Sequence, residues 1–297
     1  MSTSYRHARH RCGAITVQRD AGGILRGTGY TSDEQMKKTT SAAVYAVVNQ
    51  KGGVGKTTTA VNVAAEIALS GKKVLLIDAD PQANATSGVG VEKSAVEHSL
   101  YDVLVEGTDI RSIILPSVSS ITGLDLLPSS LDLSGAEMVL YSEQNLQREF
   151  VLRKALKSVL PLYDTILIDG PPSLGLLTVN ILAAAERLLI PIQCEYYALE
   201  GISQLLTVIE RIRAEMNRNL EITLVILTMQ DSRTNLSQQV IEEVRTFFGD
   251  KVAKTMVPRN VKLSEAPSFG RPIALYDGKS RGAQAYHDLA EEILSLP

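Results

Sequence analysis

Residues 44–58 read Val44-Tyr-Ala-Val-Val-Asn-Gln-Lys-Gly-Gly-Val-Gly-Lys-Thr-Thr58. The first part of this stretch is almost continuously apolar and rich in valine, which is typical of a strand buried on both faces of a parallel sheet. Small apolar residues then recur at helical spacing from Thr58 to Ser70, and Gly71 follows as a residue suited to end a helix. The stretch therefore predicts a strand, a glycine-rich loop and a helix in immediate succession.

The loop has the composition of a phosphate-binding site. Its glycines permit positive φ angles and close approach of the backbone to a ligand, and its N–H groups point at phosphate oxygens together with the helix N-terminus. Lys56 is expected to reach the β- and γ-phosphates, and the Thr57 hydroxyl is expected to bind Mg²⁺. The predicted nucleotide-binding residues of the loop are Gly52, Gly53, Val54, Gly55, Lys56, Thr57 and Thr58. The usual pattern has a glycine where this chain has Gln50.

Two further apolar runs end in carboxylates. Val74–Asp78 is followed by Asp80, and Thr165–Asp169 ends in Asp169. The carboxyl ends of parallel strands are where open α/β sheets bind ligands. A carboxylate there can hold a water in line with a phosphate, or bind in the outer shell of Mg²⁺. Asp169 is the predicted outer-shell residue.

Strands and helices are predicted to alternate along the rest of the chain. The other predicted strands are Leu124–Pro128, Leu188–Ile192, Ile222–Met229 and Val252–Val257, and the other predicted helices are Leu199–Asn217, Ser237–Phe248 and Arg281–Leu296. This alternation predicts an α/β fold in three layers, with a mostly parallel central sheet flanked by helices. One domain is expected over residues 41–297.

Composition limits the possible classes of protein. The 297 residues are 44% hydrophobic and carry a net charge of −3, which taken alone argues against nucleic-acid binding. Residues 1–40 carry +4 and the remainder −7, so any DNA contact by the body requires a local basic patch. The longest mostly apolar stretch, Leu174–Ala185, is too short to span a bilayer. Two cysteines cannot form a disulfide framework, which fits a reducing cytoplasm.

Residues 1–40 show no helical or strand periodicity and are rich in Ser, Thr, Gly and Arg. They are predicted to be a disordered basic extension. A basic arm that touches DNA or a membrane surface is an alternative. A true start near Met36 is another.

The loop from Lys51 to Thr58 resembles the deviant Walker A family, which includes ParA, MinD and the nitrogenase iron protein. The resemblance implies a P-loop NTPase fold. It also implies that Lys51 reaches across a nucleotide-sandwich homodimer to the phosphates of the other subunit. Asp80 would position the attacking water. Asp78 would belong to the nucleotide-dependent switch segment and to the coordination shell of Mg²⁺. The implied catalytic residues are therefore Lys51, Lys56 and Asp80, and the metal residues are Thr57, Asp78 and Asp169.

The chain is most similar to the chromosomal ParA (Soj) partition ATPases. The resemblance is carried by Asp80–Gly88, Gln193–Gly201, Asp231–Leu236 and Val257–Pro267. It implies ATP as the nucleotide, with Pro258 and Asn260 contacting the base. Family members usually carry Cys or Thr where this chain has Gly170. The smaller residue is expected to make the following switch loop more flexible.

ParA resemblance also implies partners. An ATP-bound dimer would bind double-stranded DNA without sequence preference, and a ParB-like centromere-binding protein would stimulate hydrolysis and release the dimer. The predicted DNA contacts are Arg233, Lys262 and Arg259, with Arg281, Arg211, Arg213 and Arg218 as weaker candidates. The protein would be cytoplasmic and nucleoid-associated, without membrane contact.

Three other classes of protein fit the sequence less well. A MinD-type membrane ATPase needs a basic amphipathic helix at the C-terminus, whereas Tyr286–Leu294 is acidic on its polar face. An iron–sulfur reductase needs paired cluster cysteines, whereas Cys12 and Cys194 lie in a tail and after a strand. A DNA-binding scaffold that binds ATP but hardly hydrolyses it is disfavoured by the presence of Lys56 and Asp80.

Overall fold

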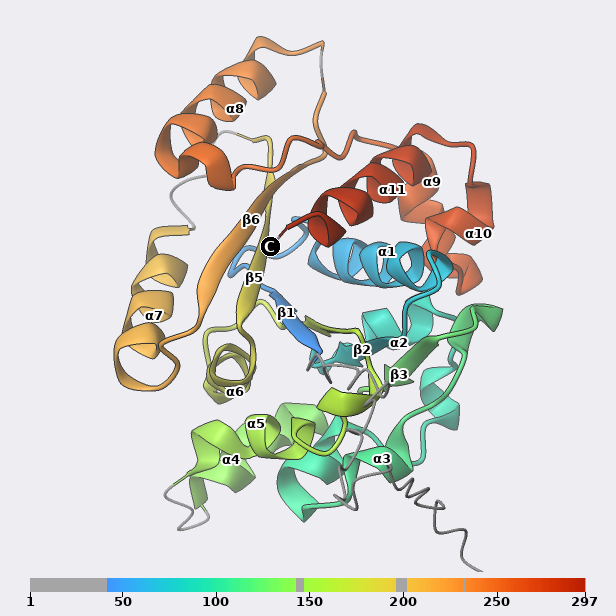
Figure 1. Ribbon diagram of the computed structural model, residues 1–297, viewed down its shortest axis with the longest axis vertical. Helices are drawn as coiled ribbons and strands as arrows, with labels where there is room; N and C mark the ends of the chain where they lie inside the picture. The colour runs from blue at the N-terminus through green and yellow to red at the C-terminus, as the bar shows by residue number, and fades with distance from the viewer. Residues whose placement is uncertain (1–41, 143–146, 196–201, 232, 297) are drawn as a thin grey trace, which may run out of the picture. The chain divides into compact units, whose positions relative to one another are not determined.

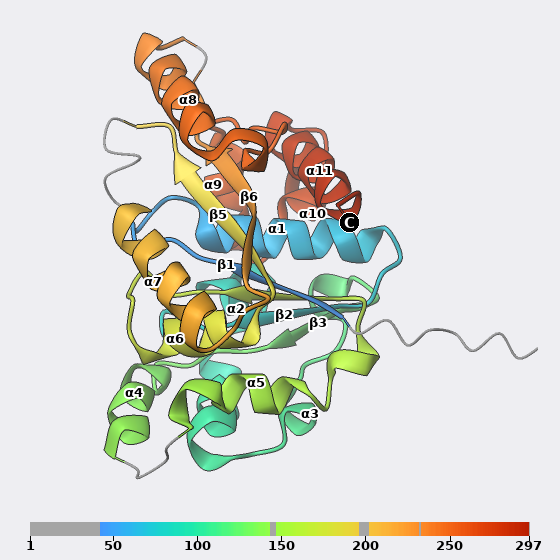
Figure 2. The same cartoon turned by 60° about the vertical axis from the view of Figure 1, so that its left-hand side comes forward.

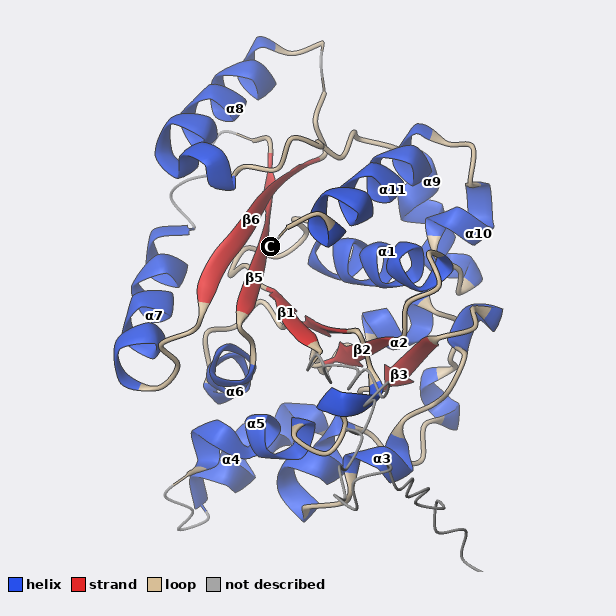
Figure 3. Ribbon diagram, in the orientation of Figure 1, coloured by secondary structure: helices blue, strands red, loops and turns tan. Residues whose placement is uncertain are grey.

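The computed structural model describes residues 42–142, 147–195, 202–231 and 233–296 (Figure 1). The predicted N-terminal extension, residues 1–40, and Cys12 lie outside the described residues. Six strands form one sheet in the order β3-β2-β4-β1-β5-β6, and each pairs in parallel with its neighbours (Figure 3). The strands are β1 Ala43–Val47, β2 Val74–Asp78, β3 Leu124–Leu127, β4 Thr165–Asp169, β5 Arg187–Gln193 and β6 Glu221–Thr228.

Helices cover both faces of this sheet, with α1 and α11 on one side and α5 and α6 on the other (Figure 2). The α-helices are α1 Lys56–Leu69, α2 Asn84–Gly88, α3 Ile110–Ile113, α4 Leu133–Ser142, α5 Val151–Leu156, α6 Leu176–Ala184, α7 Ile202–Glu215, α8 Asn235–Phe248, α9 Val261–Glu265, α10 Ile273–Asp277 and α11 Arg281–Leu294. Short helices of other types are η1 Lys93–Ala95, η2 Asp102–Glu106, η3 Val118–Ser120, η4 Arg148–Phe150, η5 Leu160–Leu162, η6 Gly249–Lys251 and η7 Ala266–Phe269.

Alternate residues of each strand enter two separate hydrophobic clusters. In β1, Val44 and Ala46 belong to the cluster that includes α5, α6 and α7, whereas Tyr45 and Val47 belong to the cluster that includes α1 and α11. Successive side chains of a strand point to opposite faces, so both faces of the sheet are buried. The predicted three-layer α/β fold is confirmed, and the sheet is parallel at every pairing.

One predicted strand is wrong. Val252 forms a single bridge with Val225, and Pro258, one residue beyond the predicted strand, forms another with Gln230, but no continuous ladder joins them. The backbone N–H groups of Lys254 and Thr255 donate instead to the Glu292 carboxylate of α11, at 2.8 and 3.0 Å. This distant carboxylate interrupts the pairing that the local β-branched composition favours.

The predicted helices lie close to their observed positions. Helix α1 begins at Lys56, two residues before the prediction, because Gly55 at its N-cap has a left-handed φ of 89°. Helix α7 begins at Ile202 among the described residues, so the predicted start at Leu199 lies outside them. None of the helices in the described part of the chain has the length and apolar character needed to cross a membrane.

Candidate nucleotide-binding site

The glycine-rich loop connects the end of β1 to the start of α1, as predicted. Gly53 and Gly55 have φ angles of 75° and 89°, which side chains rarely tolerate. The Thr228 hydroxyl at the end of β6 donates to the Val54 carbonyl at 2.8 Å. The end of β6, which is separated from β1 by β5 and was not predicted to take part, therefore holds the loop.

Lys56 lies inside the curve of this loop. Its side chain is buried, and its Nζ donates to the carbonyl oxygen of Lys51 at 3.1 Å. Burial lowers the pKa of the Lys56 ammonium, and the charges of Asp169 and Asp80 oppose that shift. The loop thus holds a buried cation close to its own backbone, and a charged donor of this kind is suited to phosphate oxygens.

Asp169 faces this cation from the end of β4. It is in register with Val47 of β1 and with Asp78 of β2, so the three strand ends lie side by side. Asp169 is fully buried, and neither carboxylate oxygen has a hydrogen-bond partner among the described residues. Burial raises the pKa of Asp169, and the charge of Asp78 adds to the rise. The Thr57 hydroxyl, which is close but outside hydrogen-bond geometry, and the Lys56 charge oppose it.

Buried carboxylate oxygens without partners are costly unless a cation or donor satisfies them. Asp169 and the nearby Thr57 hydroxyl are oxygen ligands of the kind that Mg²⁺ uses, directly or through water. Within the described ranges, this site included, His, Cys, Asp and Glu side chains form no group of three or more that could hold a metal ion by themselves. The residues present therefore fit an ion that a nucleotide and water would help to coordinate.

Asp78 acts here as an anchor for the segment that follows it. Its Oδ2 accepts the backbone N–H and the hydroxyl of Thr86, both at 2.7 Å, and its Oδ1 accepts the N–H of Asp80 at 3.2 Å. Burial raises the pKa of Asp78 to about 6, and these hydrogen bonds favour its charged form. Its predicted metal role remains a prediction.

Asp80 lies almost fully buried at the same edge. Its Oδ1 accepts the N–H of Gln82 at 2.9 Å, and its backbone carbonyl accepts the Ser129 hydroxyl at 2.7 Å. The negative charge of Asp80 acts to raise the pKa of both Lys56 and Asp169. The structure thus brings the strand-end carboxylates and the loop lysine together. Thr86 and Ser129 hold the Asp78–Asp80 turn. The sequence marked Thr86 only as part of the family-resemblance segment Asp80–Gly88, and it did not mark Ser129.

Lys51 occupies the outer side of the loop. Its Nζ lies 3.9 Å from Oε2 of Glu195, and its side chain is 35% exposed. The other oxygen of Glu195 lies 3.4 Å from an Arg259 nitrogen. Glu195 follows β5 in a segment that the sequence singled out only for its family resemblance, so its pairing with Lys51 was not predicted.

The predicted base-contact residues lie at the end of β6. Gln230 donates its N–H to the Val257 carbonyl at 3.1 Å and pairs with Pro258 in an isolated bridge. The Asn260 side-chain oxygen accepts the Lys262 N–H at 2.8 Å and caps α9. Their contact with a base remains a prediction, and Asn260 also serves as a helix cap.

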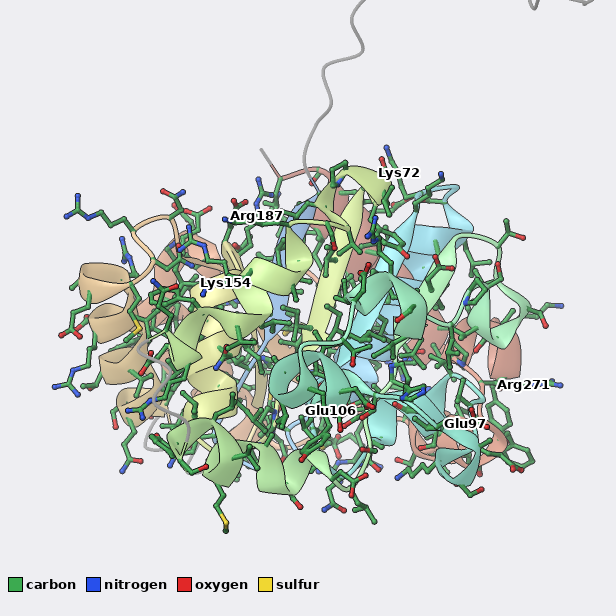
Figure 4. All side chains as sticks on the ribbon, turned by 90° about the horizontal axis from the view of Figure 1, so that it is seen from below. Lys72, Glu97, Glu106, Lys154, Arg187 and Arg271 are labelled. Atoms are coloured by element: carbon green, nitrogen blue, oxygen red, sulfur yellow. The ribbon has the colours of Figure 1, made fainter. Side chains whose placement is uncertain are left out.

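The three predicted DNA-contact cations are exposed, and each has an acidic partner. Arg233 pairs with Asp231 at 2.7 Å, Lys262 with Glu265 at 2.9 Å, and Arg259 with Glu195 at 3.4 Å. Other cations, including Lys72 and Arg187, lie at the opposite edge, where β2 and β5 begin (Figure 4).

Gly170 follows Asp169 in a confined place. Its N–H donates to the Val47 carbonyl at 3.1 Å, and an added Cβ would lie 3.2 Å from that oxygen and from the Val48 side chain. A larger residue here requires its neighbours to move by a few tenths of an ångström. The expected effect of Gly170 on the next loop remains a prediction.

A glycine loop between the first strand and helix of a parallel sheet, with acids on the adjacent strand ends, defines the P-loop class of nucleotide-binding proteins. Residues 42–222 match the family model described as an AAA domain. The chain is 54% identical to the sporulation initiation inhibitor protein Soj of Bacillus subtilis (strain 168), over 84% of this chain and 97% of that protein. The chain belongs to the ParA/Soj family of chromosome-partitioning proteins.

One further relative agrees with this assignment, and one solved structure is similar in fold. The chromosome partitioning protein ParA of Caulobacter vibrioides (strain NA1000 / CB15N) is 48% identical, over 85% of this chain and 94% of that protein. A crystal structure described as cobyrinic acid a,c-diamide synthase from Mycobacterium smegmatis, with bound ATP analog and magnesium, is 34% identical and superposes with a TM-score of 0.74. That match covers 85% of this chain and 94% of the other.

Proposed function

We propose that this protein is an ATP-dependent DNA partition ATPase. ATP with Mg²⁺ would join two copies into a sandwich dimer, the dimer would bind DNA without sequence preference, and hydrolysis stimulated by a ParB-like partner would release it. The observation that carries the proposal is the buried Asp169 carboxylate, unpaired among the described residues, beside Lys56 and Thr57 of the phosphate loop. Such a site would hold a polyphosphate and its cation. The ATP-bound dimer, through its contact with DNA, would be located at the nucleoid.

Nucleotide hydrolysis needs positioning and charge neutralisation more than covalent chemistry. Lys56 would neutralise the β- and γ-phosphates, the loop N–H groups would orient them, and Asp80 would position the attacking water. Mg²⁺, held by Thr57 and in its outer shell by Asp169, would supply further neutralisation of phosphate charge. The Mycobacterium smegmatis structure carries an ATP analog and magnesium on a similar fold, although the partition proteins have the higher sequence identity.

Lys51 is suited to a role across a dimer interface. It lies at the outer side of the loop and has one weak ion pair, at 3.9 Å, with the half-exposed Glu195. Exposed ion pairs of this kind contribute about 0–1 kcal/mol. The phosphates of a second subunit, with several negative charges, would compete effectively for this lysine.

DNA binding would come from the local cations rather than from the net charge of −3. Arg233, Lys262 and Arg259 each hold an acidic partner at the surface. A phosphate can replace such a partner, with release of counterions from DNA. A dimer would present the set twice, which would strengthen the contact and its dependence on salt.

A DNA-binding measurement at two salt concentrations tests the proposal. We expect retention on DNA with ATP and Mg²⁺, but not with ADP or without nucleotide, and we expect it to weaken steeply as salt rises. Binding that is equal in all three nucleotide conditions would contradict the proposal. Binding to anionic vesicles instead of DNA would favour the MinD-type alternative.

Arg233→Glu should remove most of this DNA binding while the ATP-dependent dimer still forms. Each phosphate contact contributes about one unit to the salt slope, and a dimer would lose two. Arg111→Glu is a matched control, because Arg111 bonds an aspartate two residues earlier, as Arg233 does. Equal DNA retention by wild type and Arg233→Glu, measured by mobility shift, would exclude Arg233 from the interface.

A further inference from the structure

The segment that follows Asp78 and Asp80 touches the segment that carries Lys262 through two glycines. Gly90 lies just beyond α2, and Gly270 ends the helical run formed by α9 and η7. An added Cβ on Gly90 would lie 2.9 Å from the Gly270 carbonyl oxygen, and one on Gly270 would lie 2.7 Å from the Gly90 Cα. Backbone meets backbone here, so no side-chain rotation can relieve a closer approach.

On one side, this contact is tied to Asp78 and Asp80. Asp78 holds Thr86 of α2 through two hydrogen bonds of 2.7 Å, and Ser129 holds the Asp80 carbonyl at 2.7 Å. The chain then turns through Gly90, whose N–H donates to the Ser87 carbonyl at 3.0 Å. Any shift of the Asp78–Thr86 turn when a phosphate binds would therefore move Gly90.

On the other side, Gly270 follows directly on Lys262. Helix α9 begins at Val261 and runs without a break into η7, which ends at Phe269. Gly270 has a left-handed φ of 60° and donates its N–H to the Pro267 carbonyl at 3.0 Å. A displacement of Gly270 would be transmitted along this short rigid segment to Lys262.

A second connection holds the far end of the same segment in place. Asn62 of α1 accepts the Ile273 N–H at 2.7 Å and donates to the Thr58 carbonyl at 2.7 Å. Of the two residues between these connections, Arg271 and Pro272, the arginine points outward from the body (Figure 4). The segment is thus fixed to the phosphate-loop helix α1 at Ile273 and touches the α2–Gly90 segment at Gly270. A push at Gly270 would therefore rotate the segment about Ile273.

We propose that Gly90 and Gly270 are positioning residues that couple the nucleotide state to the DNA-contact surface within one protomer. The inference rests on the proposed function, because it explains how ATP would alter DNA affinity. A change around Asp80 would move Gly90 against Gly270 and reorient Lys262. Dimerisation and this coupling would then act together.

Alanine at either glycine tests the coupling. Gly90→Ala and Gly270→Ala should lower the ratio of DNA affinities with ATP and with ADP by about tenfold, within the usual range of coupling effects. ATP binding and ATP-dependent dimerisation should persist, which mass measurement in solution can verify. Gly71→Ala and Gly107→Ala are matched controls, because both glycines have positive φ angles, 89° and 71°, but no atom within 4 Å of an added Cβ.

The controls separate backbone strain from contact. All four variants should lose some thermal stability, because alanine is strained at positive φ. Only Gly90→Ala and Gly270→Ala should show a lower ratio of DNA affinity with ATP to DNA affinity with ADP. An unchanged ratio in Gly90→Ala and Gly270→Ala, or an equal loss in the controls, would overturn the proposal.

Hydrogen exchange on the wild-type chain gives a test that does not depend on any variant folding. Addition of a non-hydrolysable ATP analogue with Mg²⁺, compared with ADP, should change amide protection both in 84–90 and in 261–271. A change confined to 84–90 would overturn the coupling. Wild type that fails to bind DNA with ATP would count against the proposed function, whereas the exchange experiment still decides the coupling.

Discussion

Lys56→Ala should lower ATP affinity by about 100-fold or more, since hydrogen bonds from a charged donor contribute about 1.5–3 kcal/mol each and two phosphates would lose theirs. The Lys56 ammonium is buried and held inside the loop by the Lys51 carbonyl. Water cannot readily replace it there. Isothermal titration with ATP and Mg²⁺ measures the effect.

Two other lysines make this prediction specific. Lys51→Ala should keep nucleotide binding by the monomer but lose ATP-dependent dimerisation, because Lys51 lies at the outer side of the loop. Lys72→Ala, at the opposite edge of the sheet, should change neither property (Figure 4). Retention of wild-type ATP affinity by folded Lys56→Ala would refute the phosphate-loop assignment.

Asp80→Ala should lower the hydrolysis rate by about 10²–10⁴-fold, the usual contribution of a positioned acid–base group. The Gln82 N–H and the Ser129 hydroxyl fix the Asp80 side chain and backbone beside the loop. Loss of the carboxylate removes the group proposed to position the attacking water but leaves Lys56 in place. The ATP-bound dimer should therefore accumulate and stay on DNA.

Phosphate release and light scattering together measure both parts of this expectation. Asp80→Asn preserves the size of the side chain and should give the same result, which separates loss of charge from loss of packing. Glu97→Gln, at an exposed glutamate, should hydrolyse at the wild-type rate. An Asp80→Ala protein that remains monomeric with ATP, or that hydrolyses normally, would contradict the role proposed for this carboxylate.

Much of the nucleotide site could be predicted from local patterns. The valine-rich runs predict buried strands, and the glycines predict the loop. Parallel strands necessarily bring their carboxyl ends, and the acids that follow them, to one edge of the sheet. Local sequence therefore predicts that Lys56, Thr57, Asp80 and Asp169 lie together at this edge. The segment Val252–Val257 shows the limit of this reasoning, because a carboxylate on α11 overrides its strand preference.

The tertiary structure decided the contacts between residues far apart in the chain. Thr228 supports the phosphate loop, Glu195 forms a weak ion pair with Lys51, and Gly90 touches Gly270. Such pairs leave no periodic signal, because each depends on how two finished elements approach. Local sequence thus determined which groups carry the proposed chemistry, whereas packing between distant elements determined which neighbours hold those groups in place.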